Sequence, residues 1–226
     1  MNYKDYIVVI PARKNSKRIK GKNLRELNGR PLISHSIEYA IKFFSRKNIW
    51  VNTDDNKIID LAKGYNISTY IRPSSLAEDE TSTNDVILDF CKHLISEDVN
   101  FKNIIILQPT NPIRTKSLIT EAIKSFEGSN TNSLMSVSIL HKKFGKIKNN
   151  KYHPINYKIG QRHQDLENLY YENGLIYISS KKSLFENKNY LNNDTLPFIT
   201  DEIGSIVDID YEDDLKLAEL IIKYYN

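Results

Sequence analysis

The chain has 226 residues, 40% of them hydrophobic and 27% charged, a composition that predicts a single globular domain over residues 1–226. The mean hydropathy of −0.48 and apolar runs of about four residues exclude a membrane-spanning class, because a spanning helix needs roughly 18 apolar residues. Met1 to Tyr6 lead directly into an apolar stretch, so we expect no signal peptide. Cys91 is the only cysteine, which excludes a disulfide framework and leads us to expect a cytoplasmic protein.

Short β-branched strands alternate with amphipathic helices along most of the chain. The first strand, Tyr6 to Ile10, is stopped by Pro11, and Pro31 opens a helix that we expect to run through Phe44. Further strands are expected at 49–51, 67–71, 103–107, 134–139, 174–178 and 205–209, with helices around 58–62 and at 82–96, 117–126 and 212–225. This order predicts an α/β fold of three layers, with helices on both faces of a mainly parallel sheet.

Ligands of such sheets gather at the carboxyl ends of the strands, which are here the loops after Ile10, Val51, Ile71 and Leu107. The alternation of strands and helices stops between residues 141 and 168, where the sequence is polar and rich in lysine and tyrosine. We expect this stretch to be either a disordered loop or a small lobe, inserted at about 141–170, that reaches a partner.

The net charge of +4 is mild, but the cations are unevenly distributed. Six of them lie in one loop after the first strand: Arg13, Lys14, Lys17, Arg18, Lys20 and Lys22. Such a loop can meet the roughly four negative charges of a nucleoside triphosphate. The glycine and Lys-Ser/Thr spacing of a Walker loop is absent. A solvated surface loop or a nucleic-acid patch would explain these residues equally well.

Two carboxylates, Asp208 and Asp210, flank Ile209 at the end of an expected strand. Strand alternation would place both carboxylates on one side, where they could share Mg²⁺ with substrate phosphates. The simpler alternative is that Asp210 caps the last helix while Asp208 is solvated, and a single D-x-D pattern favours this alternative.

The segment from Gln108 to Arg114 follows the fourth strand and contains Pro109 and Pro112. Two prolines restrict the backbone, so that Gln108 and Arg114 could be held rigidly enough to recognise a base or an acid; an ordinary turn is the alternative. The five histidines show no zinc-binding spacing, and we interpret His35, His93 and Cys91 as structural.

Six segments carry a pattern when they are taken together and in order. They are Ile10 to Arg18 with Lys22-Asn23, Asn52 to Asp54, Arg72-Pro73 with Leu76-Ala77, Leu107 to Arg114, Asn173 to Ile178, and Asp208 to Asp210. From Ile7 to about Leu220 the chain thereby resembles the acylneuraminate cytidylyltransferase family, the CMP-sialic acid synthetases. The resemblance implies a Rossmann-like nucleotidyltransferase fold with a small dimerisation lobe.

The resemblance also implies an activity: transfer of a cytidylyl group from CTP to the anomeric hydroxyl of a nine-carbon 2-keto sugar acid, with release of pyrophosphate. It implies magnesium and a homodimer in which the lobe reaches the partner's site, with no nucleic-acid or membrane partner. Because both reactants are anions, catalysis must come from positioning and charge neutralisation. Metal activation of the hydroxyl is our hypothesis, since no separate strong general base is evident in the sequence.

By position, the resemblance assigns Arg13, Lys17 and Lys22 to the triphosphate, with Asn23 and Arg72 beside them and Ser82 on the nucleotide. It assigns Gln108, Asn173, Arg162 and, from the partner's lobe, Lys146 to the sugar acid. It assigns Asp208 and Asp210 to magnesium, with Asp210 counted among the catalytic residues beside Arg13, Lys17 and Lys22.

Three positions depart from the family pattern. Where relatives commonly carry Arg-Gln-Asp-Leu-Pro and then Tyr-Arg-x-Asn-Gly, this chain has His163 and Tyr171 in place of arginines and Glu167 in place of proline. Losing two permanent cations bears on an acidic substrate, and Arg162 could compensate one residue away. The acid therefore stays open among N-acetylneuraminate, legionaminate, pseudaminate and other relatives.

Three other functions remain as alternatives. A ketodeoxyoctonate-type nucleotidyltransferase shares the basic loop and the paired aspartates, but the segments at Gln108 and Asn173 count against it. A non-catalytic nucleic-acid-binding domain would leave Asp208 and Asp210 without a role. A glycosyltransferase would usually carry its D-x-D in the middle of the chain rather than near the end.

Overall fold

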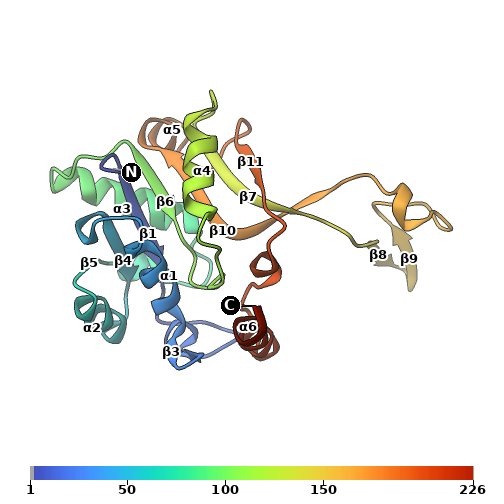
Figure 1. Ribbon diagram of the computed structural model, residues 1–226, viewed down its shortest axis with the longest axis horizontal. Helices are drawn as coiled ribbons and strands as arrows, with labels where there is room; N and C mark the ends of the chain where they lie inside the picture. Colours follow the sequence, from blue (N-terminus) through green and yellow to red (C-terminus); the bar gives the residue numbers. More distant parts are fainter. Residues whose placement is uncertain (1–2, 226) are drawn as a thin grey trace.

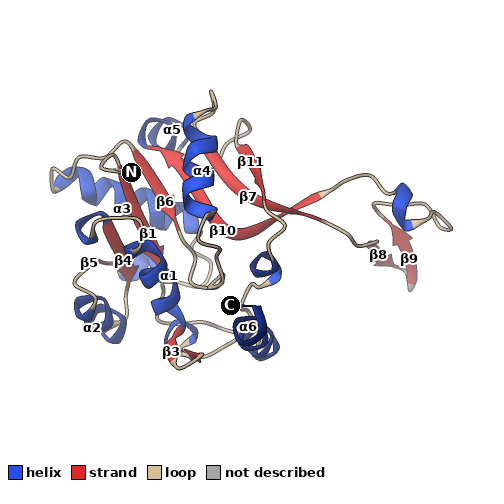
Figure 2. Cartoon of the chain, in the orientation of Figure 1, coloured by secondary structure: helices blue, strands red, loops and turns tan. Residues whose placement is uncertain are grey.

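A seven-stranded sheet forms the centre of the molecule in a computed structural model that describes residues 3–225 (Figures 1 and 2). The strands are β1 (Tyr6–Pro11), β4 (Ile49–Thr53), β5 (Ser68–Ile71), β6 (Asn103–Ile106), β7 (Ser133–Ile139), β10 (Tyr170–Ser180) and β11 (Leu196–Ile199). Their order across the sheet is β11-β7-β10-β6-β1-β4-β5. The pairs β1–β4, β1–β6, β4–β5 and β7–β11 are parallel, whereas β10 runs antiparallel to both of its neighbours.

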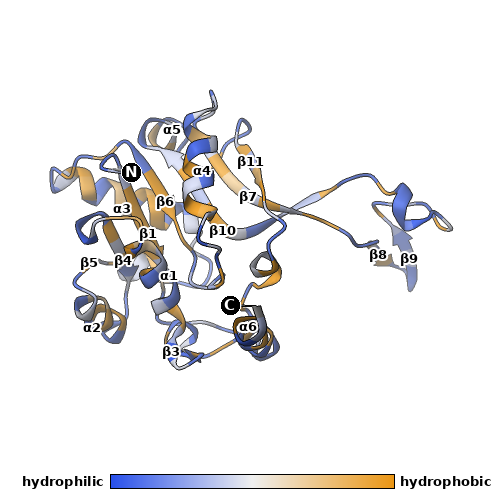
Figure 3. Cartoon of the chain, in the orientation of Figure 1, coloured by the Kyte–Doolittle hydropathy of each residue, from blue (hydrophilic) through white to orange (hydrophobic). Residues whose placement is uncertain are grey.

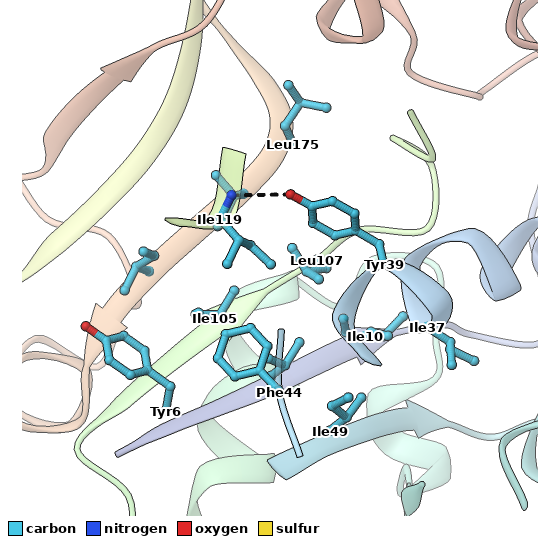
Figure 4. Packing of buried hydrophobic residues seen from close by; sticks show 14 of the residues in the cluster. Tyr6, Ile10, Ile37, Tyr39, Phe44, Ile49, Ile105, Leu107, Ile119 and Leu175 are labelled. Carbon is cyan, nitrogen blue, oxygen red and sulfur yellow. Dashed lines mark hydrogen bonds between the residues drawn. The ribbon is translucent and has the colours of Figure 1, made fainter. Parts of the chain in front are cut away.

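Helices cover both faces of this sheet, as the sequence predicts. They are α1 (Leu32–Ile41), α2 (Asn56–Gly64), α3 (Thr83–Ser96), α4 (Leu118–Glu127), α5 (Lys181–Asn187) and α6 (Glu212–Tyr225). Alternate residues of β1 face opposite cores: Val8 and Ile10 pack with α1, α2 and α4, while Ile7 and Val9 pack with α3 and α5. Figure 3 shows these strands as predominantly hydrophobic, and Figure 4 shows the first core around Phe44, where Tyr39 accepts a hydrogen bond from the Ile119 amide.

A third, smaller core fixes the C-terminal helix close to the basic loop. Leu215, Ala218 and Ile221 of α6 pack with Ile19 and Leu27, next to the small hairpin of β2 (Glu26–Leu27) and β3 (Arg30–Pro31). The basic loop and the acidic segment that contains Asp208 and Asp210 are therefore held side by side.

Short 3-10 helices lie at Lys22–Leu24, Arg46–Asn48, Ser74–Leu76, His163–Asp165 and Ile203–Ile206.

A slender lobe, residues 141–168, projects far from the body on the ends of β7 and β10 (Figure 1). It contains the hairpin of β8 (Gly145–Lys148) and β9 (Lys151–Pro154). The Leu140 amide donates to the Leu169 carbonyl at 2.7 Å where the two arms leave the sheet. No side chain from 141 to 170 is buried. The expected insertion is thus an ordered projection, and its role in dimerisation stays a prediction.

Most helices and strands of the central layers agree with the sequence prediction, and the main difference lies near the C-terminus. The three-layer α/β fold is confirmed, and the expected helix from Pro31 ends at Ile41. The strand expected at 205–209 is wrong, because this segment bonds to a loop: the Ile209 amide donates to the Thr110 carbonyl at 2.8 Å. The sequence does not predict helix α5, strand β11 or the two small hairpins β2–β3 and β8–β9. Within the described residues, no helix is long and apolar enough to cross a membrane.

Candidate active site

A cavity of about 330 Å³ opens at the carboxyl ends of the parallel strands, where the topology predicts ligand binding. It is lined by Pro11, Arg13, Lys22, Asn23, Arg72, Asp79, Thr81, Thr83, Val86, Gln108, Pro109, Thr110, Asp208 and Asp210. A second cavity of about 260 Å³ adjoins it and adds Ser16, Lys17 and Arg18. The structure therefore brings the basic loop, the Gln108 segment and the paired aspartates to one place.

Four of the six cations of the basic loop are held by two carboxylates. Arg13 Nη1 donates to Asp79 Oδ1 at 2.7 Å, and Lys17 Nζ lies 3.1 Å from Asp79 Oδ2. Lys22 Nζ donates to the Ile209 carbonyl at 2.7 Å and to Asp210 Oδ1 at 3.0 Å, while Arg18 pairs with Asp210 Oδ2. Sequence reasoning missed Asp79, which lies in no motif and comes close only through the fold.

The buried side chain of Asn23 and the carboxylate of Asp54 set the shape of this loop. Asn23 is 7% exposed, and its Nδ2 donates to the Arg13 carbonyl at 2.9 Å. Asp54 Oδ1 accepts from the Lys14 amide at 2.7 Å, which ties the loop to the end of β4. Although Asn23 lines the cavity, its amide group fixes the backbone that presents Arg13.

Arg72, just after β5, is fixed by a single neighbour. Its Nε donates to Asn52 Oδ1 at 2.8 Å and its Nη2 to the Asn52 carbonyl at 3.2 Å. Burial lowers the pKa of Arg72 to about 10, so the guanidinium is still charged at neutral pH. The remaining donors of Arg72 can bind an anion in the cavity. The contact with Asn52 explains why the segment Asn52 to Asp54 occurs together with this arginine.

Asp208 and Asp210 have different environments although they are two residues apart. Partial withdrawal from water raises the pKa of Asp208, and the Asp210 carboxylate raises it further, against the hydrogen bond from Thr110. Partial burial disfavours the ionised Asp210, but Lys22 and Arg18 outweigh this effect and hold its pKa below the usual value. Neighbouring carboxylates whose charges repel are suited to a divalent cation.

This pair fits magnesium in donor type and in number. Mg²⁺ is commonly bound through one or two carboxylates, with substrate phosphates and waters completing its oxygen ligands. In the part of the chain that the structure describes, no group of three or more His, Cys, Asp or Glu side chains gathers as a self-sufficient metal site. The metal would therefore depend on phosphate ligands, and Arg18 would have to share Asp210 with it.

The Gln108 segment divides into one residue that faces the cavity and one that supports it. Gln108 lines the cavity. Arg114 points into the protein, where it donates to the Leu175 and Gln108 carbonyls at 2.8 Å each and to Ser36 Oγ at 3.0 Å. The expectation that Arg114 recognises a ligand is therefore wrong, because its donors hold the backbone that positions Gln108.

Asn173 and Gly174 also lie behind the cavity wall. Asn173 is 4% exposed, and its Nδ2 donates to Ser138 Oγ and Thr200 Oγ1 at 2.9 and 2.8 Å. Its carbonyl accepts from Asn111 Nδ2, which also donates to the Val207 carbonyl at 2.9 Å. Asn173 does not line the cavity. The amide of Asn111 instead joins this motif to the segment that carries Asp208.

The remaining expected residues lie at the margin or far away. Ser82 is exposed and caps α3 by accepting from the Asp85 amide at 3.1 Å, between cavity residues Thr81 and Thr83. Lys146 lies on β8 in the lobe. Arg162, also in the lobe, pairs with Asp165 at 2.8 Å. Within one subunit these two cations are not at the cavity, so their expected contact with a sugar acid needs a second subunit.

The two positions that lack the family's usual arginines lie at the base of the lobe and in the sheet. A ring nitrogen of His163, Nε2, lies 2.8 Å from the His141 carbonyl, which connects the two arms of the lobe. Tyr171 pairs with Ser138 in the β7–β10 ladder. Neither residue lines the cavity, where the segment after β6 contributes the polar, uncharged side chains of Gln108 and Thr110.

A sequence profile described as "Cytidylyltransferase" matches residues 7–223. The chain belongs to the cytidylyltransferase family. The CMP-N,N'-diacetyllegionaminic acid synthase of Legionella pneumophila is 33% identical to this cytidylyltransferase over 229 residues, covering 96% of each chain. An N-acylneuraminate cytidylyltransferase of Streptococcus agalactiae serotype V is 31% identical over 92% of this chain. These similarities confirm the resemblance to the acylneuraminate cytidylyltransferases.

The coverage of the relatives differs. This cytidylyltransferase spans 51% of the S. agalactiae relative but 96% of the pseudaminic acid cytidylyltransferase of Campylobacter jejuni, to which it is 27% identical. A solved structure of CMP:2-keto-3-deoxy-manno-octonic acid synthetase with CTP superimposes with a TM-score of 0.69 at 16% identity, over 96% of this chain and 98% of the other. That likeness shows a shared fold.

Proposed function

We propose that this cytidylyltransferase transfers CMP from CTP to the anomeric hydroxyl of a nonulosonic acid, a nine-carbon 2-keto sugar acid, and releases pyrophosphate. The observation that carries the proposal is the convergence of Arg13, Lys17, Lys22 and Arg72 with two aspartates on two adjoining cavities. Relatives named for legionaminic, pseudaminic and acylneuraminic acids support the choice of acceptor.

In this reaction the cations neutralise the triphosphate as the acceptor approaches. Lys22 lies between the two cavities and bonds to Asp210, so its ammonium can contact the phosphate that is attacked. Arg13 and Lys17 extend into the second cavity, where the departing pyrophosphate would lie. Gln108 faces the first cavity as a neutral donor and acceptor for the sugar. Charge neutralisation by fixed cations is a major source of phosphoryl-transfer catalysis.

Magnesium is the proposed cofactor, with Asp208 and Asp210 as its protein ligands. When bound there, it would polarise the reacting phosphate and favour ionisation of the acceptor hydroxyl. The cavity lining contains no histidine, which supports the hypothesis that no separate imidazole base is used. The buried, unpaired Cys91 is compatible with our proposal that the protein works in a reducing cytoplasm.

We also propose that the lobe docks on a second copy of the chain. A hairpin of two strands is at best marginally stable alone, and residues 141–170 bury no side chain. The lobe exposes Ile147 and Ile159 by 78% and 82%. The lobe carries seven cations and two carboxylates, and its net charge of +5 exceeds the net charge of +4 of the whole chain. Docking would cover the apolar residues and bring Lys146 and Arg162 towards an acidic acceptor.

The activity is tested by pyrophosphate release with CTP and magnesium. The acceptor panel contains N-acetylneuraminate, legionaminate, pseudaminate and ketodeoxyoctonate, and UTP and GTP control for the choice of base. We expect turnover with CTP and a nine-carbon acid. If CTP binds but no acid reacts, the acceptor assignment is wrong; if CTP does not bind either, the cytidylyltransferase activity itself is refuted.

The lobe proposal predicts a weaker dimer when Ile147 is replaced. Ile147→Lys should raise the dimer dissociation constant by about tenfold or more, because an apolar contact is exchanged for a charge in an already basic segment. Analytical ultracentrifugation measures this constant. Ile71→Lys on the edge strand β5, where Ile71 is 68% exposed, is the matched control and should leave it unchanged. A wild-type protein that is monomeric at micromolar concentration would refute the proposal.

A further inference from the structure

Asp79 forms ion pairs with two of the cations that are assigned to the phosphates. It lies between the 3-10 helix Ser74–Leu76 and α3, outside every motif of the sequence. One carboxylate oxygen accepts from Arg13 at 2.7 Å, and the other lies 3.1 Å from the ammonium of Lys17. Arg13 Nη1 also approaches the Glu78 carbonyl at 3.5 Å. Two cations assigned to the triphosphate are thus already paired with a protein carboxylate.

The position of Asp79 coincides with the route of the phosphates. Its side chain lines both the cavity of about 330 Å³ and the adjoining one of about 260 Å³. Arg13, Lys22 and Asn23 are shared by the same two cavities. A pyrophosphate group that contacts Arg13 and Lys17 must therefore either displace the carboxylate or lie against its negative charge.

Displacement is inexpensive because the ion pairs are partly exposed. The side chains of Arg13, Lys17 and Asp79 are 31%, 66% and 37% accessible to solvent. Ion pairs of this kind are individually weak, whereas a di- or triphosphate offers several charges to the same donors. The hydrogen bond and charge of Lys17, aided by Arg13, hold the pKa of Asp79 below its usual value. The carboxylate therefore stays ionised and ready to pair again.

We propose that Asp79 is an exchangeable counter-ion: the β- and γ-phosphates displace it from Arg13 and Lys17, and its return weakens the retention of pyrophosphate. This inference rests on the proposed function of the same site. It makes Asp79 a determinant of product release, since the carboxylate competes for the donors that would otherwise hold pyrophosphate. In this proposal the CMP part of the product lies in the first cavity, which Lys17 does not line, so the affinity for CMP should depend much less on Asp79.

The test measures pyrophosphate binding by calorimetry with magnesium present and no acceptor. Asp79→Asn should lower the dissociation constant of pyrophosphate by about 3- to 30-fold, the range set by two exposed ion pairs. The inhibition constant of pyrophosphate against CTP should fall by the same factor, while the affinity for CMP should change less than about twofold. Thermal unfolding verifies that the variant is folded.

Glu80→Gln is the matched control, because it removes the same charge one residue away and Glu80 makes no ion pair among those found in the described residues. It should leave pyrophosphate binding unchanged. Unchanged or weaker pyrophosphate binding in Asp79→Asn would overturn the proposal, and weaker binding would show that Asp79 positions the two cations. If the wild-type protein binds neither CTP nor pyrophosphate, the proposed function fails together with this inference, and the two failures are thereby distinguished.

Discussion

Replacement of Lys22 by methionine should lower kcat for cytidylyl transfer by about 10²- to 10³-fold, the usual loss when one fixed donor to a developing charge is removed. The reason lies in the position of the ammonium, which is held by the Ile209 carbonyl and Asp210 and faces both cavities. Its side chain is only 12% accessible, so water does not readily replace it. The measurement is steady-state pyrophosphate release at saturating CTP and magnesium.

Lys20→Met provides the control for this variant. Lys20 is exposed and lies outside both cavities. Lys20→Met removes the same charge as Lys22→Met, and the kcat of this variant should stay within about threefold of the wild-type value. Both proteins should retain the wild-type unfolding temperature within a few degrees. Near-normal turnover of Lys22→Met would show that Lys22 serves only to position Asp210.

Gly174→Ala should lower the free energy of unfolding by about 3–5 kcal/mol. The activity should fall as well, because less of the protein is folded. Gly174 has φ of +73°, and a Cβ would lie 2.4 Å from Asn111 Oδ1. The buried Asn111 amide, which holds the Asn173 and Val207 carbonyls, would have to move. Thermal unfolding should show a loss of roughly 10 °C for a chain of this size.

Gly29→Ala separates the two causes of this destabilisation. Gly29 has nearly the same φ, +75°, but a Cβ there would meet nothing within 4 Å. It should therefore cost only the backbone strain of about 1–2 kcal/mol. Equal losses in the two variants would contradict the predicted collision with Asn111. The double variant Gly174→Ala/Asn111→Ala should lose less than the sum of the single variants, because the clashing amide is gone.

The central layers of the fold could be predicted from the sequence, because each strand and helix there carries its own period. β1 and α3, for example, end within one residue of the expected bounds. The direction of β10 could not be predicted: its apolar run reads the same for parallel and antiparallel pairing. The expected strand at 205–209 failed because Asn111 and Thr110, far away in sequence, take its backbone hydrogen bonds.

The candidate site was predictable where cations and carboxylates cluster in sequence, as in the basic loop and at Asp208 and Asp210. Asp79 was missed because a lone acidic residue in a polar loop carries no pattern. The motif around Asn173 predicts a contact with the substrate. A motif alone, however, does not distinguish a residue that contacts a ligand from one that supports neighbouring residues. Only the hydrogen bonds of its amide place it behind the wall.

The way in which the lobe joins the sheet makes it a detachable module. Ile139 of β7 pairs directly with Tyr170 of β10, and Leu140 bonds to Leu169, so the chain leaves and re-enters the body at adjacent points. A tight hairpin turn could close this gap without moving either strand. The sheet of the body therefore does not depend on the lobe, and lobes with different surfaces could join the same scaffold wherever the surface on which they dock changes with them.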